Sequence, residues 1–251
     1  MIINQTVSGG GSSPVATESI ALDNINGTLV KAAVQPVLNT NAIDIISAYV
    51  LAYAYKDNTF LTQSPLNGSD NMLTLDTGCL MSAFEGCTSL TNTGLSTTSG
   101  VSMDCEVGQF ALKNTYKGCT SLVLPELPMI ASINGDEGMY GIFEGCTNLY
   151  ANFEFAFLRD VTGERCLSRA FAYTDVTNLL FPALQYVSNP ENAFENMCAG
   201  LTNCTVHFPS DTYNNFIAGY ESTFGGTNTQ VLGDLDPIEP EPEPEPEEPE
   251  E

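Results

Sequence analysis

The sequence contains no tryptophan, one histidine and only seven lysine and arginine residues among its 251 residues. So few bases, none of them in a run, do not suit nucleic-acid binding, which depends on neutralising phosphates. An anionic membrane surface would repel a chain whose formal net charge is −24. The best apolar stretch, residues 42–55, is shorter than the roughly 20 residues that span a bilayer, so we expect no membrane insertion.

Motifs that bind cofactors or supply a nucleophile are also missing. No G-x-S-x-G, P-loop, dinucleotide-binding, EF-hand or H-E-x-x-H pattern occurs, and no C-x-x-C pair. No acidic residue or cysteine is placed in the sequence to orient His207 as a catalytic base. We therefore expect a non-enzymatic protein without cofactor or metal. Two carboxylates acting as in glycosidases stay open as a distant alternative, because 21 acids precede Asp234.

A heptapeptide recurs along the chain and is its strongest signal. Phe84-Glu-Gly-Cys87-Thr-Ser-Leu90 returns at residues 116–122 and 143–149 with the same aromatic, glycine, cysteine and leucine positions. Three altered copies bring the spacings to 23–32 residues and begin at Tyr53, Phe171 and Phe194. Such a period predicts a solenoid, in which no repeat buries its apolar face alone and stacking supplies the core.

Each position of the heptapeptide has an expected role in a stacked coil. The aromatic, cysteine and leucine point inward, the glycine permits a tight bend, and the Thr-Ser or Thr-Asn pair bonds turn backbone. Segments before the aromatic, such as 79–84 and 166–171, are predicted to be short helices, and a short strand follows the leucine. We expect one buried column formed by Leu90, Leu122, Leu149 and Leu179. The predicted repeat core comprises Tyr53, Leu61, Phe84, Cys87, Leu90, Tyr116, Cys119, Leu122, Phe143, Cys146, Leu149, Phe171, Leu179, Phe194 and Cys198.

The eight cysteines are interpreted as buried free thiols that pack as small apolar groups. Zinc sites usually need closely spaced pairs of ligands, often with histidine, and the cysteines lie at repeat positions instead. A disulfide between Cys198 and Cys204 is left open as the main alternative.

The two ends of the chain differ in composition from the repeats. Residues 1–41 contain a Gly/Ser linker, and we predict that they either cap the first coil or attach to another protein. Residues 42–232 form the predicted repeat domain. Residues 233–251 combine alternating proline with like charges and cannot form a core, which predicts a disordered acidic Pro-Glu tail.

The F-x-G-C-T-S-L units, together with Leu124-Pro-Glu-Leu-Pro128, resemble BspA-type leucine-rich repeats over roughly residues 42–232. Residues 206–226 also resemble the closing segment of members associated with phages and prophages of gut bacteria. The resemblance implies an α/β repeat solenoid, a leucine-rich-repeat-like stack of about five to six coils. Each coil would hold a short strand and a short helix or turn.

Stacked coils present a broad, regular surface that suits binding better than chemistry. The resemblance implies a bacteriophage virion accessory protein, a capsid or tail appendage, that adheres to protein or glycan on a host surface. A cell-surface or extracellular bacterial adhesin is the alternative, and a glycan-acting enzyme is a distant one. Residues 1–41 would contact another virion protein, and homo-oligomerisation is left open. Tyr173 is expected inside or at a coil edge, whereas the candidate surface-binding residues are Tyr150, Tyr213 and Tyr220.

Overall fold

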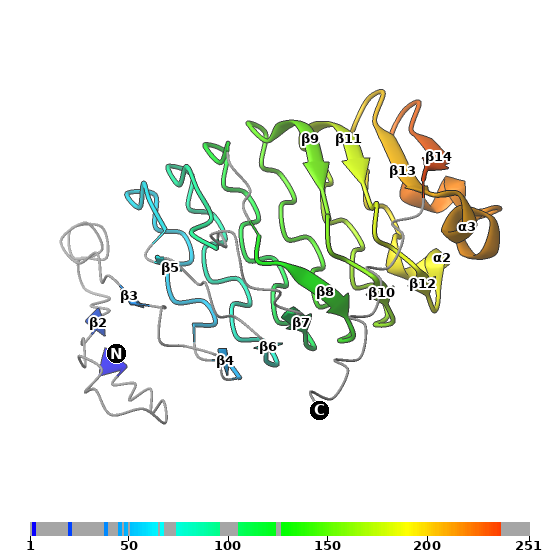
Figure 1. Ribbon diagram of the computed structural model, residues 1–251. Helices are drawn as coiled ribbons and strands as arrows, with labels where there is room; N and C mark the ends of the chain where they lie inside the picture. Colours follow the sequence, from blue (N-terminus) through cyan, green and yellow to red (C-terminus); the bar gives the residue numbers. More distant parts are fainter. Residues whose placement is uncertain are drawn as a thin grey trace, which may run out of the picture.

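The computed structural model describes residues 48–49, 51–64, 66–67, 74–95, 105–123 and 127–236, and two-residue strands at 2–3, 20–21, 38–39 and 45–46. Most of the predicted N-terminal segment and the tail residues 237–251 therefore lie outside the described residues. Strands β1 (Ile2–Ile3) and β2 (Ile20–Ala21) pair antiparallel, and β3 (Leu38–Asn39) pairs with β5 (Leu66–Asn67) in parallel. The remaining strands form two larger parallel sheets, with few and short helices, which gives the chain an α/β character (Figure 1).

Successive turns of the chain stack side by side through these two sheets (Figure 1). The six-stranded sheet has the order β12-β10-β8-β7-β6-β4 and consists of β4 (Ile45–Ile46), β6 (Thr74–Leu75), β7 (Cys105–Val107), β8 (Ile130–Ile133), β10 (Asp160–Val161) and β12 (Tyr186–Val187). The four-stranded sheet has the order β14-β13-β11-β9 and consists of β9 (Tyr150–Glu154), β11 (Asp175–Leu180), β13 (Thr205–Pro209) and β14 (Gln230–Leu235). Short helical pieces accompany the last strands: α2 (Pro190–Ala193), α3 (Ser210–Thr212), the π-helical η2 (Tyr213–Ile217) and the 3-10 η3 (Glu221–Phe224).

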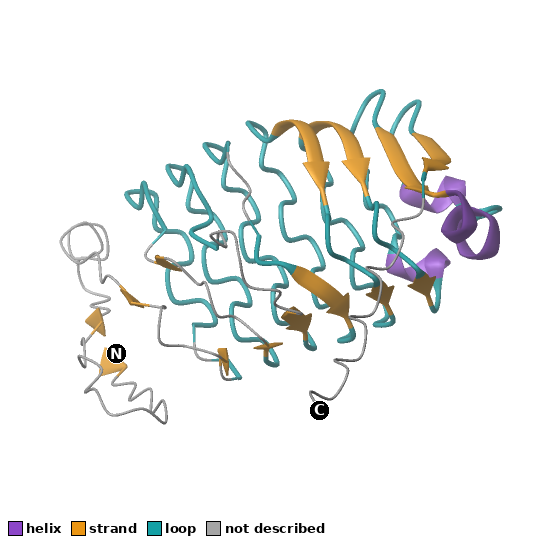
Figure 2. Cartoon of the chain, viewed as in Figure 1, coloured by secondary structure: helices purple, strands orange, loops and turns teal. Residues whose placement is uncertain are grey.

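The segments that precede the heptapeptides are runs of turns and not the short helices that the sequence predicts (Figure 2). Alternate N–H groups donate within the segment, as from Met81 to the Gly78 carbonyl at 3.1 Å, and the others donate to the next segment, as from Ser82 to the Lys113 carbonyl at 2.8 Å. Every fourth residue has a positive φ, for example Gly78, Ser82 and Gly86 at 59°, 52° and 75°. We call these segments together the turn face; their described residues are 48–49, 51–57, 77–86, 109–118, 136–145, 164–173 and 194–200.

The spacing of the coils explains why these segments are not helices. Neighbouring strands of a sheet lie about 4.8 Å apart, whereas packed helices need 8–10 Å between their axes. The six-stranded sheet precedes every turn segment, and on the other side the four-stranded sheet, or hydrogen bonds such as that from the Thr91 N–H to the Thr62 carbonyl at 3.0 Å, link the same coils at the closer spacing. A helix would also use every N–H within its own segment and leave none for the neighbouring coil.

The aromatic column of the core corrects one predicted core residue. Tyr53 is 52% exposed, whereas Tyr55 is buried and its ring stacks on Phe84 at 5.3 Å. The stack continues from Phe84 to Tyr116 at 5.4 Å and from Tyr116 to Phe143 at 5.8 Å. Side chains of the turn segment alternate between core and solvent. Tyr53 and Tyr55 are both aromatic and two residues apart, so the sequence alone does not show which of them is the buried member of the repeat. The first copy of the heptapeptide is therefore residues 55–61.

The last copy is shifted in the same way. Phe143 donates its N–H to the carbonyl before Phe171, and Phe171 donates to the Met197 carbonyl, which comes directly before Cys198. Cys198 therefore occupies the aromatic position of its coil. Phe194 lies one turn earlier, opposite Leu167, whose N–H donates to the Ala193 carbonyl. Phe194 and Cys198, both predicted as core residues, are buried, but they stand in two different columns.

The leucines of the heptapeptides are buried, although they do not form one column. Leu90, Leu122, Leu149 and Leu179 are each at most 1% exposed. Leu179, however, lies in β11 opposite Phe153 on β9 and Val206 on β13, beyond an irregularity in the register at residues 176–178. Because Phe153 comes four residues after Leu149, Leu179 stands in a different column from Leu149.

All eight cysteines are buried free thiols, as the sequence predicts. The thiols of Cys87, Cys119 and Cys146 donate to backbone carbonyls of the preceding coil at 3.0–3.1 Å. Burial raises the pKa of Cys146 to about 12, which keeps this thiol protonated. Cys198 and Cys204 form no disulfide; their side chains are hydrogen-bonded, which raises the pKa of Cys198 and lowers that of Cys204.

The C-terminal end of the described chain extends past the predicted domain boundary. Strand β14 continues to Leu235, although the sequence places the end of the repeat domain at residue 232. In the segment before it, Ser210 donates to the Gly233 carbonyl at 2.9 Å and the ring of Tyr213 packs against Gly233. Among the described residues, no helix is long and apolar enough to cross a membrane.

Candidate functional site

The turn face gathers most of the basic residues of this acidic chain. Five of its seven lysines and arginines lie there, and each forms an ion pair with a glutamate of a neighbouring coil: Lys56, Lys113, Lys117, Arg165 and Arg169. The second position of the heptapeptide alternates in charge from coil to coil, being Lys56, Glu85, Lys117 and Glu144. Opposite charges therefore face each other across the stack and favour one order of the coils.

Glu144 is the most buried carboxylate of this face. Arg169 binds it through two nitrogens, at 2.7 Å and 3.1 Å, and Lys117 approaches it to 3.3 Å. Burial alone would raise the pKa of Glu144, but the hydrogen bonds and charges of Arg169 and Lys117 outweigh it and lower the pKa below its usual value. Glu144 in turn raises the pKa of Arg169. The site is a fixed cluster of one carboxylate held between two cations.

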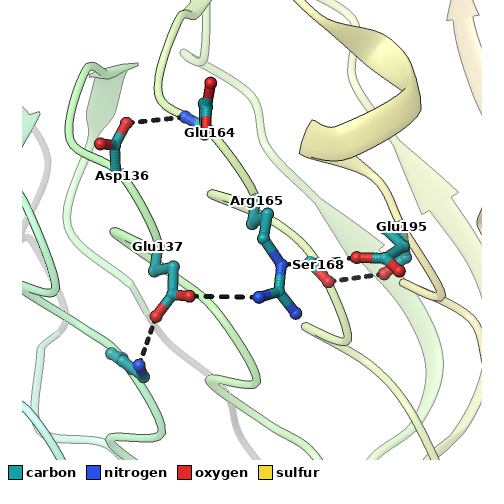
Figure 3. A network of polar contacts seen from close by, with 7 residues as sticks. Asp136, Glu137, Glu164, Arg165, Ser168 and Glu195 are labelled. Carbon is teal, nitrogen blue, oxygen red and sulfur yellow. Dashed lines mark hydrogen bonds and ion pairs between the residues drawn. The ribbon is translucent and has the colours of Figure 1, made fainter.

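A second cluster spans four neighbouring coils (Figure 3). Glu137 pairs with Lys113 and with Arg165, whose other partner is Glu195 at 3.4 Å. Ser168 donates to the Glu195 carbonyl at 2.7 Å, which ties the same two coils together. Charged groups thus run across the coils in a continuous row.

Aromatic side chains are interleaved with these charges. The Arg165 guanidinium lies 5.0 Å from the Tyr140 ring centre, and the Lys113 ammonium lies 5.5 Å from the same centre. Arg169 lies 5.7 Å from the Tyr173 ring centre. Contrary to the sequence expectation, Tyr173 is 53% exposed. Aromatic and arginine side chains are enriched in binding interfaces, and here they occur in one band.

Three exposed tyrosines of this face stand in a strained backbone conformation. Tyr49, Tyr53 and Tyr173 have φ values of 55°, 60° and 60°. A left-handed conformation costs a side-chain-bearing residue about 1–2 kcal/mol, and it is unusual for a bulky residue. Residues held in such conformations cluster at functional sites. Sequence reasoning missed this band, because no local motif marks a left-handed tyrosine.

The three tyrosines that the sequence nominated for binding do not lie together on this face. Tyr150 begins β9 on the four-stranded sheet and is 66% exposed. Tyr213 is half-buried in η2, and its hydroxyl donates to Glu221 at 2.6 Å. Tyr220 is 40% exposed and directly precedes η3. Tyr213 and Tyr220 share the closing segment, and Tyr150 belongs to another part of the molecule.

His207 does have an acidic partner, which corrects the expectation from the sequence. Its Nδ1 lies 2.9 Å from Asp234 on β14, and its Nε2 lies 3.4 Å from the Asn178 side-chain oxygen on β11. Asn178 donates to Asn152 on β9 at 2.7 Å, so a polar row crosses four strands. The partner was missed because Asp234 is distant in sequence, yet its separation of 27 residues is one repeat period.

Within the described part of the chain, no group of three or more His, Cys, Asp or Glu side chains is arranged to hold a metal ion. No protein-family model, curated protein or solved structure matches the chain. The turn face is therefore assessed by its own geometry. It offers fixed ion pairs, half-exposed aromatic rings and a regular spacing between coils, which together suit the recognition of an extended ligand.

Proposed function

We propose that the chain is a non-enzymatic binding protein that adheres to a cell surface through its turn face. The observation that carries the proposal is the band of exposed aromatic rings and fixed ion pairs across successive coils. Fixed side chains lose little freedom when a ligand binds, which favours recognition. In this proposal the stack belongs to the BspA-like leucine-rich repeat class, with about five to six coils.

The proposal includes a place for the protein: a bacteriophage particle, on which it acts as a capsid or tail appendage contacting a host surface. This part rests on the resemblance of the heptapeptides and of residues 206–226 to phage-associated repeat proteins. A bacterial cell-surface adhesin is the competing assignment. Detection in purified particles supports the first assignment, whereas detection in a host membrane fraction alone supports the second.

Binding itself is tested with the purified full chain on intact host cells. Glu164 is an exposed carboxylate of the turn face, and Asp211 is an exposed carboxylate of α3 outside it. We expect Glu164→Lys to weaken cell binding by about tenfold, because it places a new charge inside the band. Asp211→Lys changes the net charge by the same amount and should bind as the unmodified chain does. Equal loss in both variants would mean that net charge matters and not the turn face.

A further inference from the structure

Two of the strained tyrosines of the turn face lie across glycines of the neighbouring coil. A Cβ atom on Gly78 would come within 2.4 Å of the Tyr49 ring, and one on Gly200 within 2.4 Å of the Tyr173 ring. Each ring therefore occupies the space that a side chain on the next coil would need. The neighbouring backbone supports one part of the ring, while about half of the side chain stays exposed at 50% and 53%.

Stacking of the coils does not require these tyrosines. Tyr173 shares its row of the turn face with Gly118 and Gly145, as the hydrogen bonds between neighbouring coils show. Both glycines adopt the same left-handed conformation, with φ values of 73° and 76°. Glycine fits this conformation without a steric penalty, whereas tyrosine does not. The fold sets the left-handed conformation at every fourth residue of the turn face, but it does not require a large ring there. A ring that stays half in water at a position that glycine fills on neighbouring coils is better explained by a ligand than by the fold.

We propose that Tyr49, Tyr53 and Tyr173 are stacking platforms for the sugar rings of a neutral cell-surface polysaccharide. The proposal rests on the function proposed above and names its ligand class. An exposed aromatic face complements the apolar face of a sugar ring. The hydroxyl groups of the sugar match the fixed donors and acceptors beside the platforms, such as the Arg169–Glu144 pair next to Tyr173.

The charge of the turn face and the distance between its tyrosines restrict the ligand to a neutral chain of several sugars. The cations near the rings are already paired with glutamates, so the face holds no surplus positive charge that would select an anionic polymer. Tyr49 and Tyr53 lie on the first described turn segment and Tyr173 on the fifth, and four coil steps of about 4.8 Å place them about 19 Å apart. A chain of several sugars reaches both positions, and a single sugar does not.

The test removes the rings and relieves the strain in the same step. The full chain carrying Tyr49→Gly, Tyr53→Gly and Tyr173→Gly is compared with the unmodified chain for binding to host polysaccharide freed of protein by protease. The matched control is Ser82→Gly, which changes a left-handed residue of the same face whose side chain is buried. A second control replaces the three tyrosines by phenylalanine, which keeps the rings.

We expect the glycine variant to lose at least about tenfold in polysaccharide binding, as for the loss of aromatic anchors, with a melting temperature that is unchanged or higher. The Ser82→Gly and phenylalanine variants should bind normally. Unchanged binding by the glycine variant would overturn the platforms and leave cell adhesion standing. Binding that depends on protease-sensitive material would overturn the ligand class, and failure of the unmodified chain to bind cells would reject the proposed function itself. If the glycine variant unfolds, the single Tyr173→Gly variant decides by the same criteria.

Discussion

The turn face and the four-stranded sheet are two sides of the same coils, and they stack those coils in different ways. In the sheet, strands pair in parallel register and their outward side chains form amide and imidazole contacts, such as the hydrogen bond that Asn178 donates to Asn152. On the turn face, alternate N–H groups bond within the segment and the rest bond to the next coil. This backbone leaves left-handed positions at every fourth residue. The strain and most of the basic charges are therefore gathered on one side.

The largest effect on stability is expected in the core that the turn face and the four-stranded sheet share. Phe143 is fully buried and touches Tyr116 of the preceding coil and Phe153 of the sheet, at 5.8 Å and 5.7 Å between ring centres. We expect Phe143→Ala to lower the free energy of unfolding by about 3–5 kcal/mol. Denaturant unfolding measures the change, with Tyr150→Ala on the exposed surface of β9 as the control, which should stay within about 0.5 kcal/mol. A loss below about 1 kcal/mol for Phe143→Ala would show that the two sides do not share one core.

The sequence was sufficient to predict the inward positions of the three near-identical heptapeptides. Their fixed aromatic, cysteine and leucine follow from the need to form apolar columns between stacked coils. Alignment failed for the first and last copies because aromatic residues stand within two to four residues of the true column position. Tyr53 thus replaced Tyr55, and Phe194 was matched to Phe171 although it belongs with Leu167. Composition alone distinguishes neither an inward aromatic such as Tyr55 from an exposed one such as Tyr53, nor one buried column from the next.

The backbone of the turn face was not predictable from local preference. Three of the six residues at 79–84, Leu80, Met81 and Ala83, are good helix formers, and helix propensity is easily overridden by tertiary context. Here the override comes from the strand before the segment, β6, whose neighbours lie about 4.8 Å apart, and from hydrogen bonds between coils after it, such as that from the Thr91 N–H to the Thr62 carbonyl. The binding band was missed for the same reason, because its tyrosines meet the charges of other coils only after stacking. The His207–Asp234 contact, in contrast, follows from the repeat period once the coils are aligned.

The ion pairs of the turn face give the second prediction. Glu144→Gln removes the charge that binds both Arg169 and Lys117, and we expect a loss of about 1.5–3 kcal/mol, as for hydrogen bonds to charged groups. The folded state lowers the pKa of Glu144, so its stabilising effect is fully present above the unfolded value of about 4.3. The effect disappears as the pH falls through the lower folded pKa.

The direction of this pH dependence is checked by measuring the unfolding of the unmodified chain and of Glu144→Gln between pH 3 and pH 7. The difference in stability between the unmodified chain and Glu144→Gln should be largest near pH 7 and shrink below about pH 4. Glu154→Gln, an exposed carboxylate on β9 of the four-stranded sheet, is the matched control. A difference that stays constant with pH would mean that the glutamate contributes packing and not charge.

The smallest expected effect is on the sheet side, at the contact between β13 and β14. Asp234→Asn weakens the hydrogen bond with His207, and the Asp234 side chain is 48% exposed. Exposed pairs contribute about 0.2–1 kcal/mol, so we expect a loss in that range, well below that of Glu144→Gln. The backbone pairing of β14 with β13 remains in the variant. Chemical unfolding at low and high salt measures this loss of stability, with Asp211→Asn as the control. A loss as large as that of Glu144→Gln would mean that the polar row of the sheet holds the coils as firmly as the ion pairs of the turn face do. The contrast between the two sides would then lie in backbone conformation alone.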